Sequence, residues 1–179
     1  MNNAALLNTV RFFVLVFFQV TVFNNIHFLG FITPYPYILF ILLYPLNINR
    51  NLFLILSFSL GLILDIFNNS GGIHTTACIT LAFVRQNLLK MSFGYSYEYH
   101  MFRIPNKISR ELTTYFVAGV LIHHTILIGL EVFNINFIGK ILLWILSSSL
   151  FTIILLFLIT GLIKSFKKWE SCCFPSLWF

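Results

Sequence analysis

Charged side chains are scarce in this chain. Its 179 residues include 11 Lys and Arg and 5 Asp and Glu, so 9% of the side chains are charged, against about 25% in an ordinary soluble domain. Hydrophobic residues make up 59% of the chain, and the mean hydropathy is +0.91. This composition leaves no room for a water-soluble enzyme domain and is too apolar for a disordered chain. We therefore expect residues 1–179 to form a single integral membrane domain.

Cysteines and catalytic motifs are also few. Cys78 lies within an apolar run, and Cys172 and Cys173 lie close to the end of the chain in a segment expected to face a reducing compartment, so no disulfide is expected. The sequence contains no histidine–glutamate zinc motif, no glycine-flanked nucleophilic serine and no glycine-rich phosphate loop. We therefore expect neither enzymatic activity nor a cofactor.

Long uncharged runs predict six membrane-spanning helices. A helix rises 1.5 Å per residue and the hydrocarbon layer is about 30 Å thick, so about 20 residues cross it. The 38 uncharged residues between Arg11 and Arg50 must turn, and Asn24 and Pro34 lie where a helix would break. The expected fold class is all-α, a bundle of six transmembrane helices at about residues 10–23, 31–46, 51–67, 73–90, 112–131 and 141–163.

The basic residues are concentrated in alternate loops. If the N-terminus is cytoplasmic, ten of the eleven Lys and Arg lie in inner segments, and only Lys140 faces outward. Because cytoplasmic loops retain positive charge, both termini are expected in the cytoplasm. Anionic lipid accounts for the net charge of +6, so no nucleic acid is implied. Five of these residues are expected at the cytoplasmic membrane interface, where a partner could also dock: Arg85, Lys90, Arg103, Lys107 and Arg110.

Asp65 is the most informative polar residue. A carboxylate inside a membrane helix costs about 2.5–3.5 kcal/mol, so its presence needs an explanation. Ser57, Gly61 and Asp65 recur every four residues and share one helical stripe, on which small side chains allow a neighbouring backbone to approach. Two interpretations remain open. Asp65 either bonds a neighbouring helix or the following turn, or it anchors a partner or ligand.

Other ionisable residues are expected at the level of Asp65. His74 begins the fourth predicted helix and Glu131 ends the fifth, so the two can join Asp65 in an outer polar cluster. His123 and His124 lie about two turns deeper. Adjacent histidines project about 100° apart on a helix, whereas a metal needs three or four convergent ligands, so we expect structural histidines and no metal.

The order of these motifs resembles the MreD family of bacterial rod shape-determining proteins. The resemblance covers about residues 2–164 and includes Gly72-Ile73-His74 after the glycine–acid stripe, Arg85, and the His123-His124 pair followed by Glu131-Val132-Phe133. In the second predicted span it includes Pro34, Tyr37, Phe40 and Pro45. Other members have proline in the turn after the acid, where this chain has Asn68, Asn69 and Ser70.

The resemblance implies a noncatalytic scaffold or regulator in the bacterial cytoplasmic (inner) membrane. Members of the family belong to the cell-wall elongation machinery, in which MreC links cytoplasmic MreB filaments to the glycosyltransferase RodA and its transpeptidase. MreC is the expected primary partner, RodA and its transpeptidase are further ones, and MreB is linked indirectly. The resemblance places Gly61, Asp65 and His74 on the face that shapes these contacts.

A second function remains open on the same residues. The substrate-binding membrane subunit of an energy-coupling vitamin transporter also uses six short helices. Asp65, His74 and Glu131 could line a pocket that opens outward and holds a small molecule. A stoichiometric vitamin retained by the purified protein would favour this alternative.

Overall fold

The computed structural model describes residues 3–26, 33–46, 49–94, 109–132 and 138–173, and within these ranges the regular secondary structure is entirely helical. The all-α prediction is therefore confirmed for the described residues. The elements are α1 (Asn3–Thr21), the 3₁₀ turn η1 (Phe23–Asn25), α2 (Ile38–Leu43), α3 (Arg50–Asn68), α4 (Ile73–Phe93), α6 (Arg110–Val132) and α7 (Ile138–Cys173).

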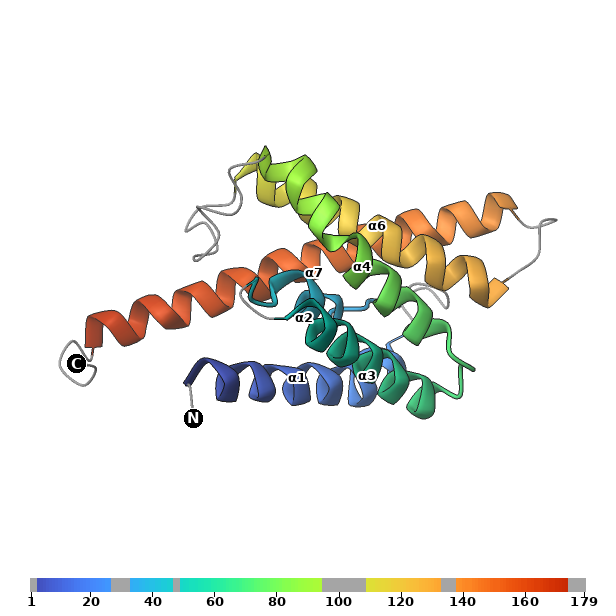
Figure 1. Ribbon diagram of the computed structural model, residues 1–179. Helices are drawn as coiled ribbons and strands as arrows, with labels where there is room; N and C mark the ends of the chain where they lie inside the picture. Colours follow the sequence, from blue (N-terminus) through green and yellow to red (C-terminus); the bar gives the residue numbers. More distant parts are fainter. Residues whose placement is uncertain (1–2, 27–32, 47–48, 95–108, 133–137, 174–179) are drawn as a thin grey trace.

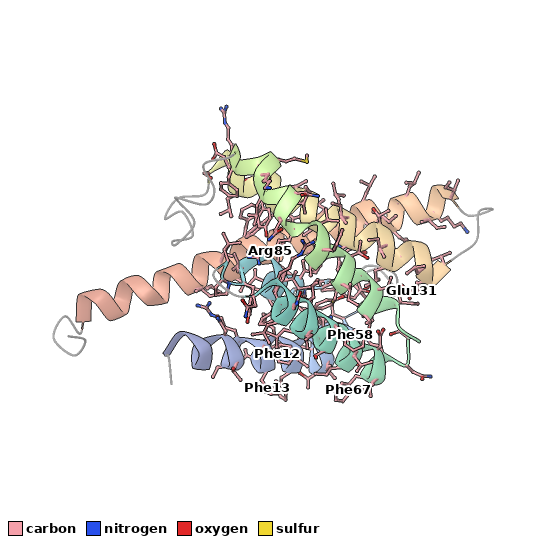
Figure 2. The ribbon with its side chains drawn as sticks, viewed as in Figure 1. Phe12, Phe13, Phe58, Phe67, Arg85 and Glu131 are labelled. Carbon is pink, nitrogen blue, oxygen red and sulfur yellow. The ribbon has the colours of Figure 1, made fainter. Side chains whose placement is uncertain are left out.

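Among the described residues, three helices are long and apolar enough to cross a membrane: α3, α6 and the Ile138–Ile163 part of α7. They contain the predicted spans 51–67, 112–131 and 141–163. Many of their large apolar side chains point away from the rest of the molecule, as do those of α1. Phe13 and Phe67 in Figure 2 are examples, each 63% exposed. Such surfaces are what a surrounding lipid phase requires.

Helix α4 covers the predicted span 73–90, but a larger share of its residues is polar than in the other long helices. It packs between α3 and α6, and nine of its side chains are buried, including His74, Thr75 and Arg85. The buried polar side chains of α4 therefore meet protein partners rather than lipid.

The predicted second span, 31–46, needs correction. In the described part of this segment the only α-helix is α2, whose six residues reach about 9 Å, far less than the bilayer thickness. Pro34 and Pro36 precede it, and proline cannot donate the hydrogen bonds that would extend a helix. Residues 34–42 are all buried, which is where irregular backbone is tolerated in a membrane protein.

Arg85 also differs from its prediction as an interface residue. It is only 4% exposed, and its guanidinium donates hydrogen bonds to the backbone carbonyls of Leu42 and Tyr44 and, at 3.2 Å, to the Tyr115 hydroxyl. Its Cζ lies 4.9 Å from the centre of the Phe53 ring. A positive charge at these carbonyls satisfies the C-terminal end of α2, so Arg85 holds the broken segment inside the molecule.

Helices α1, α3 and α6 run toward one end of the molecule, and α4 and α7 run in the opposite direction (Figure 1). Helix α1 begins and α7 ends at one end of the molecule, at the left of Figure 1. The turn between α3 and α4 and the C-terminal end of α6 lie at the other end, here called the Asn68 end. The short α2 lies among α1, α4 and α6.

Candidate functional site

The Asp65 side chain joins the end of α3 to the start of α4. Its Oδ1 accepts hydrogen bonds from the Ser70 hydroxyl at 2.5 Å and the His74 backbone N–H at 2.9 Å. Its Oδ2 accepts from the backbone N–H of Thr75 at 2.8 Å and from the Thr75 hydroxyl at 2.5 Å. The two backbone donors belong to the first turn of α4, where the N–H groups have no acceptors within the helix. Asp65 therefore caps α4 from the preceding helix.

Gly61 lies where the backbones of α3 and α4 touch. A Cβ atom at this position would lie 2.4 Å from the Thr75 Cα and 2.9 Å from the His74 carbonyl oxygen. Ser57, one turn earlier, is fully buried and donates to the Phe53 carbonyl oxygen. The Ser57–Gly61–Asp65 stripe is therefore a helix-packing face, and α4 of the same chain occupies it at Gly61 and Asp65.

A line of side-chain hydrogen bonds runs from α1 to α4 at the Asn68 end. Gln19 Nε2 donates to Asn24 Oδ1 at 3.0 Å, and Asn24 Nδ2 donates to Asn68 Oδ1 at 2.5 Å. Asn68 Nδ2 then lies 3.1 Å from His74 Nε2, to which it donates. The oxygen and the nitrogen of both asparagine side chains thus each have a partner within the chain.

The line continues through Tyr37 to α6. The Tyr37 hydroxyl lies 2.9 Å from His74 Nδ1 and 2.9 Å from His123 Nε2. Because His74 Nε2 accepts from Asn68, its Nδ1 carries the hydrogen and donates to Tyr37, which donates in turn to His123. His123 Nδ1 is buried and has no hydrogen-bond partner among the described residues.

His123 and His124 are adjacent in sequence but serve different contacts. His124 pairs its Nδ1 with the Val120 carbonyl oxygen and its Nε2 with the Thr152 hydroxyl on α7. The Tyr35 ring packs against both His124 and His74. Its centre lies 5.4 Å from that of the His124 ring and 5.7 Å from that of the His74 ring. In the described part of the chain, no group of three or more His, Cys, Asp or Glu side chains is arranged to hold a metal ion.

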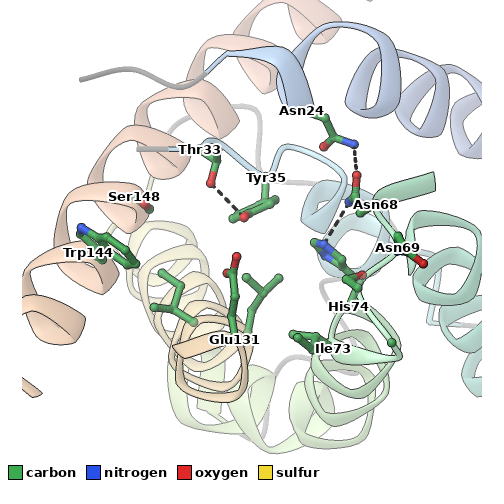
Figure 3. A pocket seen from close by; sticks show the side chains of 14 residues that line it. Asn24, Thr33, Tyr35, Asn68, Asn69, Ile73, His74, Glu131, Trp144 and Ser148 are labelled. Atoms are coloured by element: carbon green, nitrogen blue, oxygen red, sulfur yellow. Dashed lines mark hydrogen bonds between the residues drawn. The ribbon is translucent and has the colours of Figure 1, made fainter. Parts of the chain in front are cut away.

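A pocket of about 730 Å³ opens beside this network at the Asn68 end (Figure 3). Its walls come from the start of α7, the end of α6, the α3–α4 turn and the segments on either side of residues 27–32. The lining residues are Asn24, Thr33, Tyr35, Asn68, Asn69, Ser70, Gly71, Ile73, His74, Leu127, Ile128, Glu131, Trp144 and Ser148. Its volume lies within the range of about 300–1,000 Å³ typical of small-molecule sites.

No family model, curated protein or solved structure matches the chain. Its function must therefore be inferred from the geometry of this region together with the resemblance already described.

The structure separates the predicted outer cluster. His74 and Glu131 line the pocket, whereas Asp65 does not, because the α4 terminus encloses its carboxylate. Gly72 has a φ of +101° and precedes α4, a backbone conformation that favours glycine and sets the turn next to the pocket. Both ring nitrogens of His74 are engaged, so Glu131 is the predicted polar residue whose charged group remains available in the pocket.

Most of the residues that line the pocket were not singled out from the sequence as binding residues, among them Tyr35, Trp144 and Ser148. Tyr35 lies more than 100 residues before Trp144 and Ser148 of α7, and the tertiary structure brings the two segments together, as in the hydrogen bond from the Tyr35 backbone N–H to the Thr152 hydroxyl of α7. The signal available in the sequence was weak, since tyrosine and tryptophan are common at membrane interfaces.

The predicted interface residues are not all described. Lys90 on α4 and Arg110 at the start of α6 are exposed, and their place at a membrane interface stays a prediction. Arg103 and Lys107 lie outside the described residues.

Proposed function

We propose that this protein is a noncatalytic scaffold of the bacterial cell-wall elongation machinery. It is a multi-pass protein of the inner membrane with six membrane segments, of which the second contains the short α2, and with both termini in the cytoplasm. Its primary partner is MreC, and through MreC it is linked to MreB filaments, to RodA and to the RodA-associated transpeptidase. The resemblance to MreD proteins supports this role, and so does a particular surface of the α3–α4 pair.

That surface is an apolar groove of about 430 Å³ on the outer side of α3 and α4. Six uncharged side chains line it: Leu54, Ile55, Phe58, Ile79, Thr80 and Phe83. Gly61 and Asp65 hold the two helices against each other, so the chain forms the groove by itself. We assign it to the membrane helix of MreC, because van der Waals packing against a preformed groove is the main attraction available between helices in lipid.

The test is co-purification with MreC from a maltoside detergent. Ile55 is 59% exposed in the groove, and Leu146 is 62% exposed on α7, so Ile55→Ala and Leu146→Ala form a matched pair. We expect Ile55→Ala combined with Phe58→Ala to weaken the association by roughly tenfold, and Leu146→Ala combined with Leu150→Ala, on the exposed face of α7, to leave it unchanged. Equal binding by both variants would mean that lipid, rather than MreC, covers the groove.

Depletion of the protein in its own host tests the role itself. Cells without the protein should lose their rod shape and insert wall material abnormally. Depleted cells that keep a normal shape and normal wall growth would contradict the scaffold role, whatever the groove binds.

The second candidate function is the substrate-binding membrane subunit of an energy-coupling vitamin transporter. The observation that favours it is the pocket at the Asn68 end, with Glu131 and His74 in its walls. Native mass spectrometry of the purified protein tests it directly. A small molecule retained at one copy per chain would favour this function, whereas an empty protein that binds MreC would exclude it.

A further inference from the structure

Glu131 is the charged residue of the pocket and indicates which ligands the pocket can bind. In Figure 3 its side chain extends from the end of α6 into the pocket, toward Tyr35. No hydrogen bond or ion pair joins its carboxylate to another residue in the described ranges. By contrast, the carboxylate of Asp65, three residues before the lining residue Asn68, accepts hydrogen bonds from four donors. The pocket therefore contains one carboxylate that has no countercharge from the described residues.

The rest of the described lining is free of formal charge of either sign. It contains no Lys or Arg, and the one imidazole, His74, accepts a hydrogen bond at Nε2, which fits its neutral form. Of the three asparagines in the lining, Asn24 and Asn68 have amides that are engaged with Gln19, His74 and each other, and Asn69 is uncharged. An anionic ligand would meet only the like charge of Glu131, whereas a cation would neutralise it.

Two aromatic rings stand on different sides of Glu131. Trp144 comes from α7, and Tyr35 comes from the segment before α2 and is 8% exposed (Figure 3). The faces of such rings attract organic cations, and sites for ammonium groups combine aromatic walls with a carboxylate. Ser148, which is 1% exposed, adds a hydroxyl oxygen to the same wall.

We propose that this pocket binds an ammonium compound, with Glu131 as the countercharge and with Tyr35 and Trp144 as aromatic walls. The ammonium group can belong to a free amine or to the headgroup of a phospholipid, since the chemistry at the pocket is the same. Binding at this site does not depend on the scaffold role, because the groove that we assign to MreC lies on other side chains of α3 and α4.

The test uses choline and its uncharged isostere 3,3-dimethylbutan-1-ol, which has the same shape without the charge. The full chain is purified in a maltoside detergent, free of phosphocholine amphiphiles, and binding is followed by isothermal titration calorimetry. We expect choline to bind at least tenfold more tightly than the isostere, as a paired charge and cation–π contacts require. Equal affinities for the two compounds, or no binding of choline, would overturn the proposal.

Two variants test the role of the carboxylate. Glu131→Gln keeps the shape of the side chain and removes its charge, and we expect it to lose at least tenfold in choline affinity. Glu111→Gln removes a charge from the opposite end of the same helix, and we expect it to bind choline as the unchanged protein does. Unchanged binding by Glu131→Gln, or an equal loss in Glu111→Gln, would remove Glu131 from the site. Circular dichroism checks that both variants are folded.

A third measurement distinguishes the two sources of the ammonium group. The protein is placed in nanodiscs of phosphatidylglycerol alone or of phosphatidylglycerol with phosphatidylethanolamine, and choline binding is measured again. Weaker choline binding in the second membrane supports a lipid headgroup as the occupant. Equal binding in the two membranes supports a free amine. Absence of choline binding in both would overturn the proposal, and none of these outcomes affects the test with MreC.

Discussion

The α3–α4 junction and the end of α6 place two carboxylates at the same end of the molecule in opposite circumstances. At the junction, Asp65 is 6% exposed and accepts four hydrogen bonds, all from residues 70–75. At the end of α6, Glu131 is exposed and reaches into a pocket without a hydrogen-bonding partner in the described ranges. The first arrangement stabilises the fold, and the second leaves a charge available to a ligand.

This difference shows that a charged residue in a membrane protein is not functional merely because such residues are rare there. A buried carboxylate is tolerated when backbone and hydroxyl donors replace its water, and at the junction the orphan N–H groups of a helix N-terminus supply part of that set. A carboxylate that keeps its contact with solvent needs no such partners. Perturbing each site should therefore have different consequences for stability and for binding.

The largest effect on stability is expected from Gly61→Ala. The new methyl group would meet the Thr75 backbone, which cannot rotate away, so α3 and α4 must separate and the Asp65 hydrogen bonds are disturbed. We expect a loss of about 3 kcal/mol or more in the free energy of unfolding, measured in mixed maltoside–SDS micelles. Gly129→Ala on α6 is the control, since its methyl group meets no atom within 4 Å and should leave stability unchanged or improve it by about 0.5–1 kcal/mol. Equal stability of the two variants would contradict the close approach of the helices.

The next effect is expected from Asp65→Asn. The amide keeps one acceptor oxygen but turns an N–H₂ group toward donors that have no other partner. We expect a loss of about 2–4 kcal/mol in the same unfolding measurement. Thr75→Val removes one of the four donors and keeps the backbone N–H, and it should cost about 1 kcal/mol. If Asp65→Asn cost no more than Thr75→Val, the cap would not be the reason for the acid.

Tyr37→Phe tests the interior between the two sites. The hydroxyl joins His74 to His123, and without it both ring nitrogens of His123 lack a partner among the described residues. We expect a loss of about 1–3 kcal/mol in the free energy of unfolding. Tyr35→Phe is the matched control, because the Tyr35 hydroxyl contacts Thr33 at the pocket and should cost less than about 1 kcal/mol. A larger loss for Tyr35→Phe would reverse the assignment of structural and pocket-facing tyrosines.

The smallest effect on stability is expected from Glu131→Gln. The side chain is exposed and has no described partner to lose, so the free energy of unfolding should stay within about 0.5 kcal/mol of the original value. The same variant should lose choline affinity, and the two measurements together define a binding residue. A destabilisation of more than about 1 kcal/mol would make Glu131 structural, as Asp65 is.

Several features of the fold could be predicted because they depend on short-range patterns. The four-residue spacing of Ser57, Gly61 and Asp65 indicated a packing stripe, and the structure has α4 against it at Gly61 and Asp65. The uncharged runs indicated where α3, α6 and α7 lie. The segment 31–46 could not be predicted in this way, because hydropathy does not distinguish a helix in lipid from a short helix buried among others.

The candidate site was predicted less completely than the helices. His74 and Glu131 were placed at one level from their positions near helix ends, and both line the pocket. Asp65 was placed with them, but a level along the membrane normal does not say which way a side chain points. Arg85 was predicted at the surface because basic residues gather there, whereas the free carbonyls at the end of α2 bind it inside.

The amino-acid sequence by itself determined that the chain is apolar and helical, where its long helices lie, and which few residues need polar partners. These properties follow from local composition and from the fixed rise and periodicity of a helix. Only the tertiary structure decided which partner each polar residue has. The start of the next helix caps Asp65, carbonyl groups at the distant end of α2 bind Arg85, and no described group reaches Glu131, because the packing of the helices decides which hydrogen-bonding groups come near each side chain.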